Sequence, residues 1–281
     1  MGDDGGTIEP AVRSVQAMPV PQADQAIDAN GDAVIDRFGA RLGHALARRL
    51  PLRSIAMHNQ RPLVSFTFDD FPASAHAVGA NLIEARGARG TFFACTSQLG
   101  SVQEHWTDAS AEAVRDLDQR GHEIGLHTHS HRPVFNMGAA EFEADLAANK
   151  AVLHRLVPGL ARETFAYPFG FASLGRKRQL SRLVRASRSV VPGVNAGRLD
   201  PDFIKAVELI DCGLTRNRLD ELMDETVARR GWLVFLTHDI APRPSKFGAS
   251  PDLMNAALDG AVRRGIDILP MREALDRVGL G

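Results

Sequence analysis

From Pro62 onward, short β-rich segments alternate with segments of helical periodicity, and this alternation constrains the fold more than any other feature of the chain. Such alternation is typical of βα units, which build parallel sheets. Strands are expected at 63–68, 91–95, 123–127, 164–167, 184–190, 206–210, 232–236 and 266–269. Helices are expected at 74–86, 109–120, 140–156, 174–182, 218–229 and 251–264. Seven or eight units predict an α/β fold, a distorted (β/α) barrel, with a doubly wound open sheet as the alternative.

The chain divides into three parts. Residues 1–26 mix Gly, Pro, Asp and Gln without apolar periodicity, so we expect a flexible N-terminal tail. Residues 27–61 are expected to form a helical extension, with an amphipathic helix over 33–50. The barrel domain then covers 62–281. Three of its helices are followed by a glycine, where a left-handed C-terminal cap favours that residue: Gly87, Gly121 and Gly265.

Composition and charge exclude several classes of protein. The 281 residues are 44% hydrophobic and 24% charged, which is typical of a soluble globular protein. Lys and Arg number 33 against 34 Asp and Glu, so we expect no nucleic-acid partner and no attraction to an anionic membrane. The chain has no 18-residue uncharged run and no signal-peptide pattern, so a cytoplasmic location without a membrane span is expected. Cys95 and Cys212 lack the spacing of a metal knuckle, and the sequence leaves open whether they form one disulfide. The sequence does not indicate the oligomeric state.

The expected strand at 63–68 ends in two adjacent carboxylates, Asp69 and Asp70. Neighbouring residues on an extended chain face opposite ways, so the two carboxylates can serve different roles. The alternative is structural, because Asp70 can begin a turn or cap the helix that follows Pro72.

Three histidines, His127, His129 and His131, lie within five residues at the end of the expected strand 123–127. Neutral imidazole is the commonest metal ligand, and residues i and i+4 share a face. His127 and His131 can therefore bind one ion, with Asp70 as the third ligand. Two His and one carboxylate with an open position are the catalytic arrangement of zinc. His129 is ambiguous, since it also shares that strand face, and a solvated His-rich loop is the alternative.

Two further strand ends carry candidate residues. His238 follows the strand at 232–236, although a single His is more often a satisfied polar residue. The sequence Tyr167-Pro168-Phe169-Gly170 predicts a tight turn whose backbone N–H groups could bind a ligand, with an ordinary turn as the alternative.

At these residues the sequence resembles the polysaccharide deacetylase family, which is carbohydrate esterase family 4 or the nodulation-factor deacetylase homology domain. The resemblance covers roughly residues 62–270. The family motif Thr-Phe-Asp-Asp is matched at 67–70, with Phe71 where the family usually has Gly. The motif His-Ser/Thr-x-x-His is matched at 127–131, and Leu236-Thr237-His238 matches the C-terminal motif.

The resemblance implies a metal-dependent hydrolase that removes N-acetyl groups from an amino-sugar-containing polysaccharide, oligosaccharide or glycoconjugate. It implies Asp69 as the base and His238 as the acid that protonates the leaving amine. The residues that would hold the metal are Asp70, His127 and His131. Zinc is the default for these ligand types, and Co²⁺, Ni²⁺ or Mn²⁺ suit the same set. Contacts to the N-acetylated carbohydrate are expected from Tyr167, Pro168 and Phe169, with the Phe169 N–H binding the oxyanion.

The chain departs from the family pattern at two points. The family's third motif usually has an Arg two residues before its Pro, to orient the catalytic carboxylate, and that position is Ala166. Arg188 is the candidate replacement, with a surface Arg as the alternative. The fourth-motif Asp that polarises the acid His has no clear match, and Asp211 is the candidate. These departures leave two alternatives open: a hydrolase of a small non-peptide amide or ureide, and a non-catalytic carbohydrate-binding relative.

Overall fold

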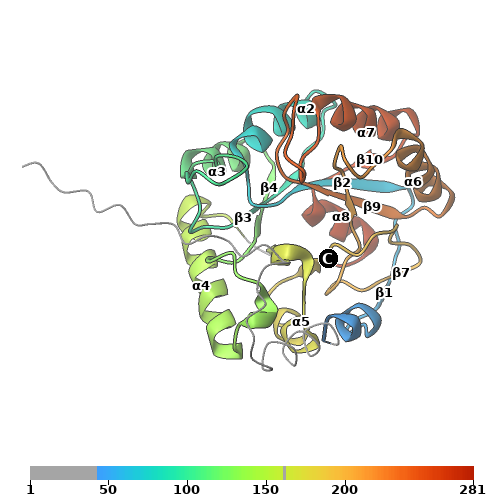
Figure 1. The fold of residues 1–281 in the computed structure, drawn as a ribbon. Helices are drawn as coiled ribbons and strands as arrows, with labels where there is room; N and C mark the ends of the chain where they lie inside the picture. Colours follow the sequence, from blue (N-terminus) through green and yellow to red (C-terminus); the bar gives the residue numbers. More distant parts are fainter. Residues whose placement is uncertain (1–42, 161–162) are drawn as a thin grey trace, which may run out of the picture. The chain divides into compact units, whose positions relative to one another are not determined.

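The computed structural model describes residues 43–160 and 163–281, which belong to one compact unit, Ala40–Gly281 (Figure 1). The tail expected at 1–26 and the first part of the helix expected over 33–50 lie outside the described residues. Residues 43–49 are helical, which agrees with the end of that helix. Within the described ranges, no helix combines the length and the apolar character needed to cross a bilayer.

Parallel strands form the predicted distorted barrel. Seven of them are neighbours in the order β6-β5-β4-β3-β2-β9-β8, and an eighth, β10, pairs with the start of β2. Their bounds are β2 (Leu63–Phe68), β3 (Thr91–Ala94), β4 (Glu123–Leu126), β5 (Thr164–Ala166), β6 (Ala186–Arg188), β8 (Val207–Glu208), β9 (Trp232–Thr237) and β10 (Asp267–Ile268). The prediction of a (β/α) barrel is confirmed, and the doubly wound alternative is not the fold of this chain.

The segment that leads into β8 links the two ends of this strand order. Ile204 pairs in parallel with Arg188 of β6, and three residues later Val207 pairs with Phe235 of β9. A small antiparallel ribbon of β1 (Ile55–Ala56) and β7 (Arg198–Leu199) lies outside the main sheet. The sequence does not predict this ribbon, because two-residue strands carry no periodic signal.

Helices surround the strands (Figure 1). They are the π-helical η1 (Ala75–Ala80), α2 (Asn81–Glu84), α3 (Ala111–Gln119), α4 (Ala139–Leu156), α5 (Leu174–Leu180), α6 (Arg216–Ala228) and α7 (Pro251–Arg263), with short 3-10 turns η2 (Val134–Asn136) and η3 (Pro168–Gly170). Four of them begin at side-chain caps that accept a first-turn N–H: Ser110, Ser173, Thr215 and Ser250. The predicted glycine caps are confirmed, since φ is +68° at Gly87, +86° at Gly121 and +64° at Gly265.

The last helix, α8 (Met271–Val278), covers one end of the barrel interior. Its apolar side chains Met271 and Leu275 share a core cluster with Leu63 and Trp232, the first residues of β2 and β9. Because α8 covers the amino ends of these strands, the opposite, carboxyl ends are left to carry a site, as in other barrels of this kind.

Candidate active site

The first part of the site lies at the carboxyl end of β2. Side chains alternate along this strand, and Asp69 falls on the same face as Leu63, which belongs to the barrel-interior cluster. The chain then turns sharply, because Asp70 and Phe71 have φ of +61° and +64°, a region that non-glycine residues rarely adopt. The turn separates the two carboxylates, so that Asp69 stays in the interior while Asp70 faces the loop after β4.

Asp70 meets two of the three histidines of that loop. Its Oδ1 lies 2.7 Å from Nε2 of His131 and 3.2 Å from Nε2 of His127. The ligand atoms of the three residues all lie within 4.8 Å of one another. His129 faces elsewhere, with its Nδ1 2.9 Å from Oγ1 of Thr96. The structure therefore brings together the three predicted metal ligands and removes the ambiguity of His129.

This group of donors fits a cation. Asp70 Oδ1 is buried and has no hydrogen-bond partner among the described residues, although two imidazole nitrogens face it. Nδ1 of His127 lies 2.9 Å from the carbonyl oxygen of Ala166. Because a carbonyl only accepts, Nδ1 carries a proton and Nε2 of a neutral His127 presents a lone pair to Asp70. A lone pair beside a carboxylate oxygen is repelled unless a proton or a metal ion lies between them.

The charges of the cluster support one another. Burial by itself would raise the pKa of Asp70, but the positive charge of His131 and the contacts with both imidazoles outweigh it, so this pKa lies well below its usual range. Burial would lower the pKa of His131, yet the attraction of Asp70 raises it above the usual value. Protons and divalent cations therefore compete for the same imidazole.

Two side chains of α4 fix the histidine loop. Asn149 is fully buried, and its Oδ1 accepts the N–H of His127 at 3.2 Å. Asp145, one turn earlier, accepts the N–H groups of His129 and Ser130 at 2.8 and 3.0 Å. Sequence reasoning missed both residues. The signal that could have revealed them is a pair of polar residues four positions apart on the inward side of the helix.

Asp69 is paired with Arg188, which reaches it from β6. Nη2 of Arg188 donates to both carboxylate oxygens. Arg188 is fully buried, with its guanidinium 5.3 Å from the centre of the Phe93 ring. It is also the register partner of Ala166 on the neighbouring strand, so the two side chains leave the sheet on the same side. The guanidinium that β5 lacks is thus supplied by β6, and the alternative of a surface Arg is wrong.

His238 lies at the end of β9 on the other oxygen of Asp70. Its Nε2 is 3.9 Å from Asp70 Oδ2, and its Nδ1 is 3.2 Å from the carbonyl oxygen of Phe247. Asp211 does not take part, because its Oδ1 accepts the N–H of Ser250 at 2.8 Å, at the start of α7. The prediction of Asp211 as the partner of His238 is therefore wrong.

The turn after β5 corrects a second prediction. Tyr167 is fully buried and its hydroxyl donates to the carbonyl of Asp202 at 3.2 Å, and Pro168 is buried as well. Neither side chain can line a binding surface, so the expectation that they contact substrate is wrong for their side chains. Phe169 is 42% exposed, and its ring centre lies 4.7 Å from that of His131. Of the three predicted contacts, only Phe169 offers a side chain at the site.

Backbone strain is concentrated around these residues. Among the described residues, six other than glycine have φ in the left-handed region, and five of the six lie in the site loops: Asp70, Phe71, Thr128, His131 and Phe169. Each such conformation costs about 1–3 kcal/mol and persists only where the surroundings impose it. The strain marks the carboxyl ends of β2, β4 and β5 as a functional site.

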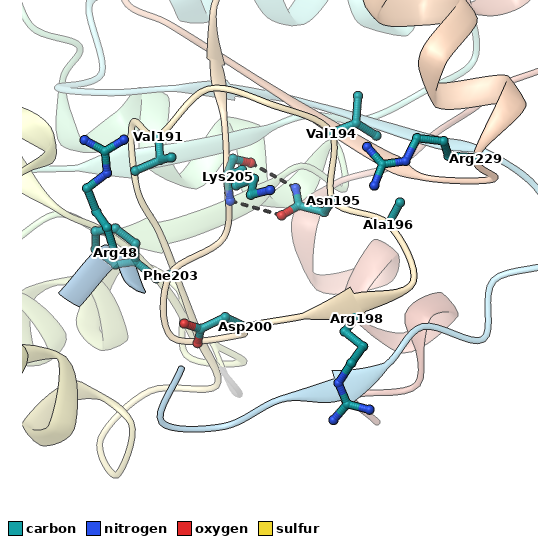
Figure 2. A pocket seen from close by; sticks show the side chains of 10 residues that line it. All are labelled: Arg48, Val191, Val194, Asn195, Ala196, Arg198, Asp200, Phe203, Lys205 and Arg229. Carbon is teal, nitrogen blue, oxygen red and sulfur yellow. Dashed lines mark hydrogen bonds between the residues drawn. The ribbon is translucent and has the colours of Figure 1, made fainter. Parts of the chain in front are cut away.

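A cavity of about 150 Å³ is lined by other residues (Figure 2). Its polar lining is mainly basic and includes Arg48, Arg198, Lys205 and Arg229, with one carboxylate from Asp200. None of the predicted site residues lines it, so it is not part of the candidate active site.

Comparison with known proteins finds a match for part of the chain. Residues 56–183 match the family model described as polysaccharide deacetylase. This stretch is a little under half of the chain, and it contains Asp69, Asp70, His127 and His131. A chitin deacetylase from Pestalotiopsis sp is 28% identical over 89 residues, which are 32% of this chain and 28% of that protein. The chain spans about a quarter of the length of the curated relatives it matches.

Solved structures share the barrel fold of this chain. The chitin deacetylase from Colletotrichum lindemuthianum superposes with a TM-score of 0.57 at 18% identity, over 80% of this chain and 91% of that one. A family 4 acetyl xylan esterase from Clostridium thermocellum, solved with a cobalt ion, gives a TM-score of 0.53 at 20% identity, over 76% of this chain and 90% of that one. At these identities the likeness shows the fold.

Proposed function

We propose that this protein is a metal-dependent hydrolase that removes N-acetyl groups from an amino-sugar-containing carbohydrate. The observation that carries the proposal is the convergence of Asp70, His127 and His131 between a buried carboxylate, Asp69, and an imidazole, His238. The match of residues 56–183 to the polysaccharide deacetylase family model and the likeness to chitin deacetylases support it.

Asp70, His127 and His131 would hold the divalent ion. Zinc suits two imidazoles and a carboxylate, and Co²⁺, Ni²⁺ or Mn²⁺ accept the same donors. When bound, such an ion polarises an acyl carbonyl and makes water a better nucleophile. The remaining steps belong to the side chains and backbone of the protein itself.

Asp69 is assigned the role of the base that takes a proton from the attacking water. Charge-assisted hydrogen bonds from Arg188 hold both of its oxygens, so the carboxylate keeps one orientation in the barrel interior. Arg188 does not need to touch the substrate for this role. It acts through Asp69 and is a positioning residue.

His238 is assigned the role of the acid. Its Nδ1 is occupied by the carbonyl of Phe247, so Nε2 is the nitrogen that faces the site and donates the proton to the departing amine. An amide nitrogen leaves only when it is protonated, and general acid catalysis of this kind contributes roughly 100- to 10,000-fold. The backbone N–H of Phe169 is the proposed donor to the oxyanion.

Two exposed aromatic surfaces favour a carbohydrate over a small ureide. Phe169 is 42% exposed beside His131, and Phe247 is 38% exposed beside His238. Aromatic surfaces around a few convergent polar groups are typical of sites for ring-shaped ligands. A pyranose ring offers apolar C–H faces that can pack on such aromatic surfaces, whereas a small planar ureide offers little apolar surface to them.

The test is acetate release from N-acetylglucosamine oligomers, compared with turnover of a panel of small amides and ureides. We expect acetate release that stops when a chelator removes the metal and returns on addition of Zn²⁺. Turnover confined to the ureides would favour the small-amide hydrolase. Equal sugar binding by chelated and metal-loaded protein, without acetate release, would favour the non-catalytic relative.

A further inference from the structure

His238 is held in an unusual way. Among the described residues, no carboxylate lies within hydrogen-bond distance of its Nδ1, which has the carbonyl of Phe247 as its partner at 3.2 Å. The imidazole turns through χ1 and χ2, and one hydrogen bond of 3.2 Å restrains it at a single atom. A contact on the face of the ring would define its plane and keep Nε2 toward the site.

The second contact is Trp106, from the segment between β3 and α3. Its ring stacks on His238 with the centres 5.5 Å apart and the planes 28° apart. The indole is itself fixed, because Nε1 donates to Oδ1 of the buried Asp108 at 2.8 Å. The other oxygen of Asp108 accepts from Nε2 of Gln103 at 2.7 Å. The indole therefore cannot turn without breaking a buried hydrogen bond.

The carbonyl of Phe247, which is the partner of His238 Nδ1, is also held in place. Asp239 is buried and accepts the N–H and the hydroxyl of Ser245 at 2.9 and 2.6 Å, which ties down the loop that carries Phe247. Gly248 lies so close that a Cβ there would stand 2.2 Å from Asp239 Oδ1, so only glycine fits. The Phe247 ring packs against both His238 and Trp106, with centre distances of 5.6 and 6.4 Å.

We propose that Trp106 is the positioning residue for His238. The indole face sets the plane of the imidazole and the Phe247 carbonyl sets its tautomer, so together they perform the task that a carboxylate partner would perform. The catalytic consequence rests on the proposed function, because it concerns proton donation by His238. The orientation of the ring is a property of the folded protein and can be tested without turnover.

The kinetic experiment compares two substrates that differ in their need for an acid. An N-acetylglucosamine oligomer loses an amine that must be protonated, whereas 4-nitrophenyl acetate loses a phenolate that leaves without a proton. We expect Trp106→Leu to lower kcat on the oligomer by about 10- to 100-fold and to change kcat on the ester by less than about twofold. Trp106→Phe keeps an aromatic face and recovers most of the loss.

The matched control is Val102→Ala, in the same segment but 81% exposed, and it should leave both rates unchanged. Equal losses on the two substrates in Trp106→Leu would show general damage to the fold or the metal and would overturn the proposal. An unchanged rate on the oligomer would overturn it as well.

A second measurement separates this proposal from the proposed function. If wild type releases no acetate, the function fails, and the ring orientation is read by NMR of ¹⁵N-labelled histidines, with His238→Ala to assign the signal. We expect a slowly exchanging Nδ1–H of His238 in wild type and Trp106→Phe, and its loss in Trp106→Leu. Persistence of that signal in Trp106→Leu would mean that the indole does not position the ring.

Discussion

Two halves of the candidate active site reach their geometry in different ways. On β2 and β4, the residues Asp69, Asp70, His127 and His131 stand where the family motifs place them. On β5, β6 and β9, other residues make the contacts that the family motifs usually make. Arg188 binds Asp69 in place of the third-motif Arg. The Phe247 carbonyl and the Trp106 indole contact His238 in place of the fourth-motif Asp. The match to the family model ends at residue 183, after β5 and before β6, so Arg188 and His238 lie outside it.

The difference follows from what each half must supply. A metal ion needs donor atoms with fixed directions, and here these depend on left-handed backbone at Asp70 and His131. An ion pair or a stacking contact needs only a group of the right kind at one point in space. In a parallel barrel, register partners such as Ala166 and Arg188 stand at the same level, so either strand can provide it.

The largest effect is expected when the metal-binding half is broken. His127→Ala removes one of three donors, so bound Zn²⁺ should be lost and acetate release should fall by about 1,000-fold or more. His129→Ala is the matched control, because its imidazole bonds to Thr96 and not to Asp70. Metal content and acetate release measure both. Stoichiometric metal in His127→Ala would contradict the assignment of the ligands.

The next prediction tests whether an Arg on β5 can replace Arg188 of β6 as the partner of Asp69. Arg188→Ala leaves Asp69 buried without its partner, which should destabilise the fold by about 3–5 kcal/mol and lower kcat by about 100-fold. Adding Ala166→Arg to this variant returns a guanidinium from the register-paired position and should recover part of both losses. Urea unfolding and acetate release are the measurements. If Arg188→Ala matches wild type in both, the ion pair has no positioning role.

The two halves also differ in how much of the candidate site the sequence predicts. The candidate ligands Asp70, His127 and His131 follow from local spacing at strand ends, and the structure brings them together. Asp211 was assigned on chain order alone, and the fold places it at the cap of α7 instead. Tyr167 was assigned from its motif, but the turn directs its side chain into the core. The place of these side chains depends on how distant strands and loops pack together, and composition and periodicity do not carry that information.

A smaller effect is expected at Phe71, where the family usually has Gly. Its left-handed φ of +64° costs about 1–2 kcal/mol. Its ring is fully buried edge-on to Phe92 at 5.8 Å, and truncating such a ring costs about 3–5 kcal/mol. Packing outweighs strain, so Phe71→Gly should lower the free energy of unfolding by about 2 kcal/mol.

The matched variant is Phe71→Ala, which loses the same ring but keeps the strained φ. It should therefore be less stable than Phe71→Gly by about 1 kcal/mol, the reverse of the usual order of Ala and Gly. Equal or greater stability of Phe71→Ala would show that the backbone relaxes at this turn. In that case the conformation would not be imposed by the site.

The last effect is confined to pH values above about 4 and concerns Asp108, which supports His238 through Trp106. Burial raises the pKa of Asp108 to about 6, and the hydrogen bonds from Gln103 and Trp106 offset only part of that rise. In the unfolded chain the pKa is the ordinary 3.8. The folded protein therefore keeps a proton that the unfolded chain has released between about pH 4 and 6. Its contribution to stability is complete below pH 4 and is lost as the pH rises through 6.

Asp108→Asn should remove this dependence. The amide cannot ionise, and its oxygen can still accept from Nε1 of Trp106, so the stack on His238 is kept. After allowance for solvent screening, the variant should be about 2 kcal/mol more stable than wild type at pH 8 and equal to it near pH 4. Urea unfolding at the two pH values measures the difference. A difference that does not change with pH would mean that the pKa of Asp108 is the same in the folded and the unfolded protein, so that burial does not raise it.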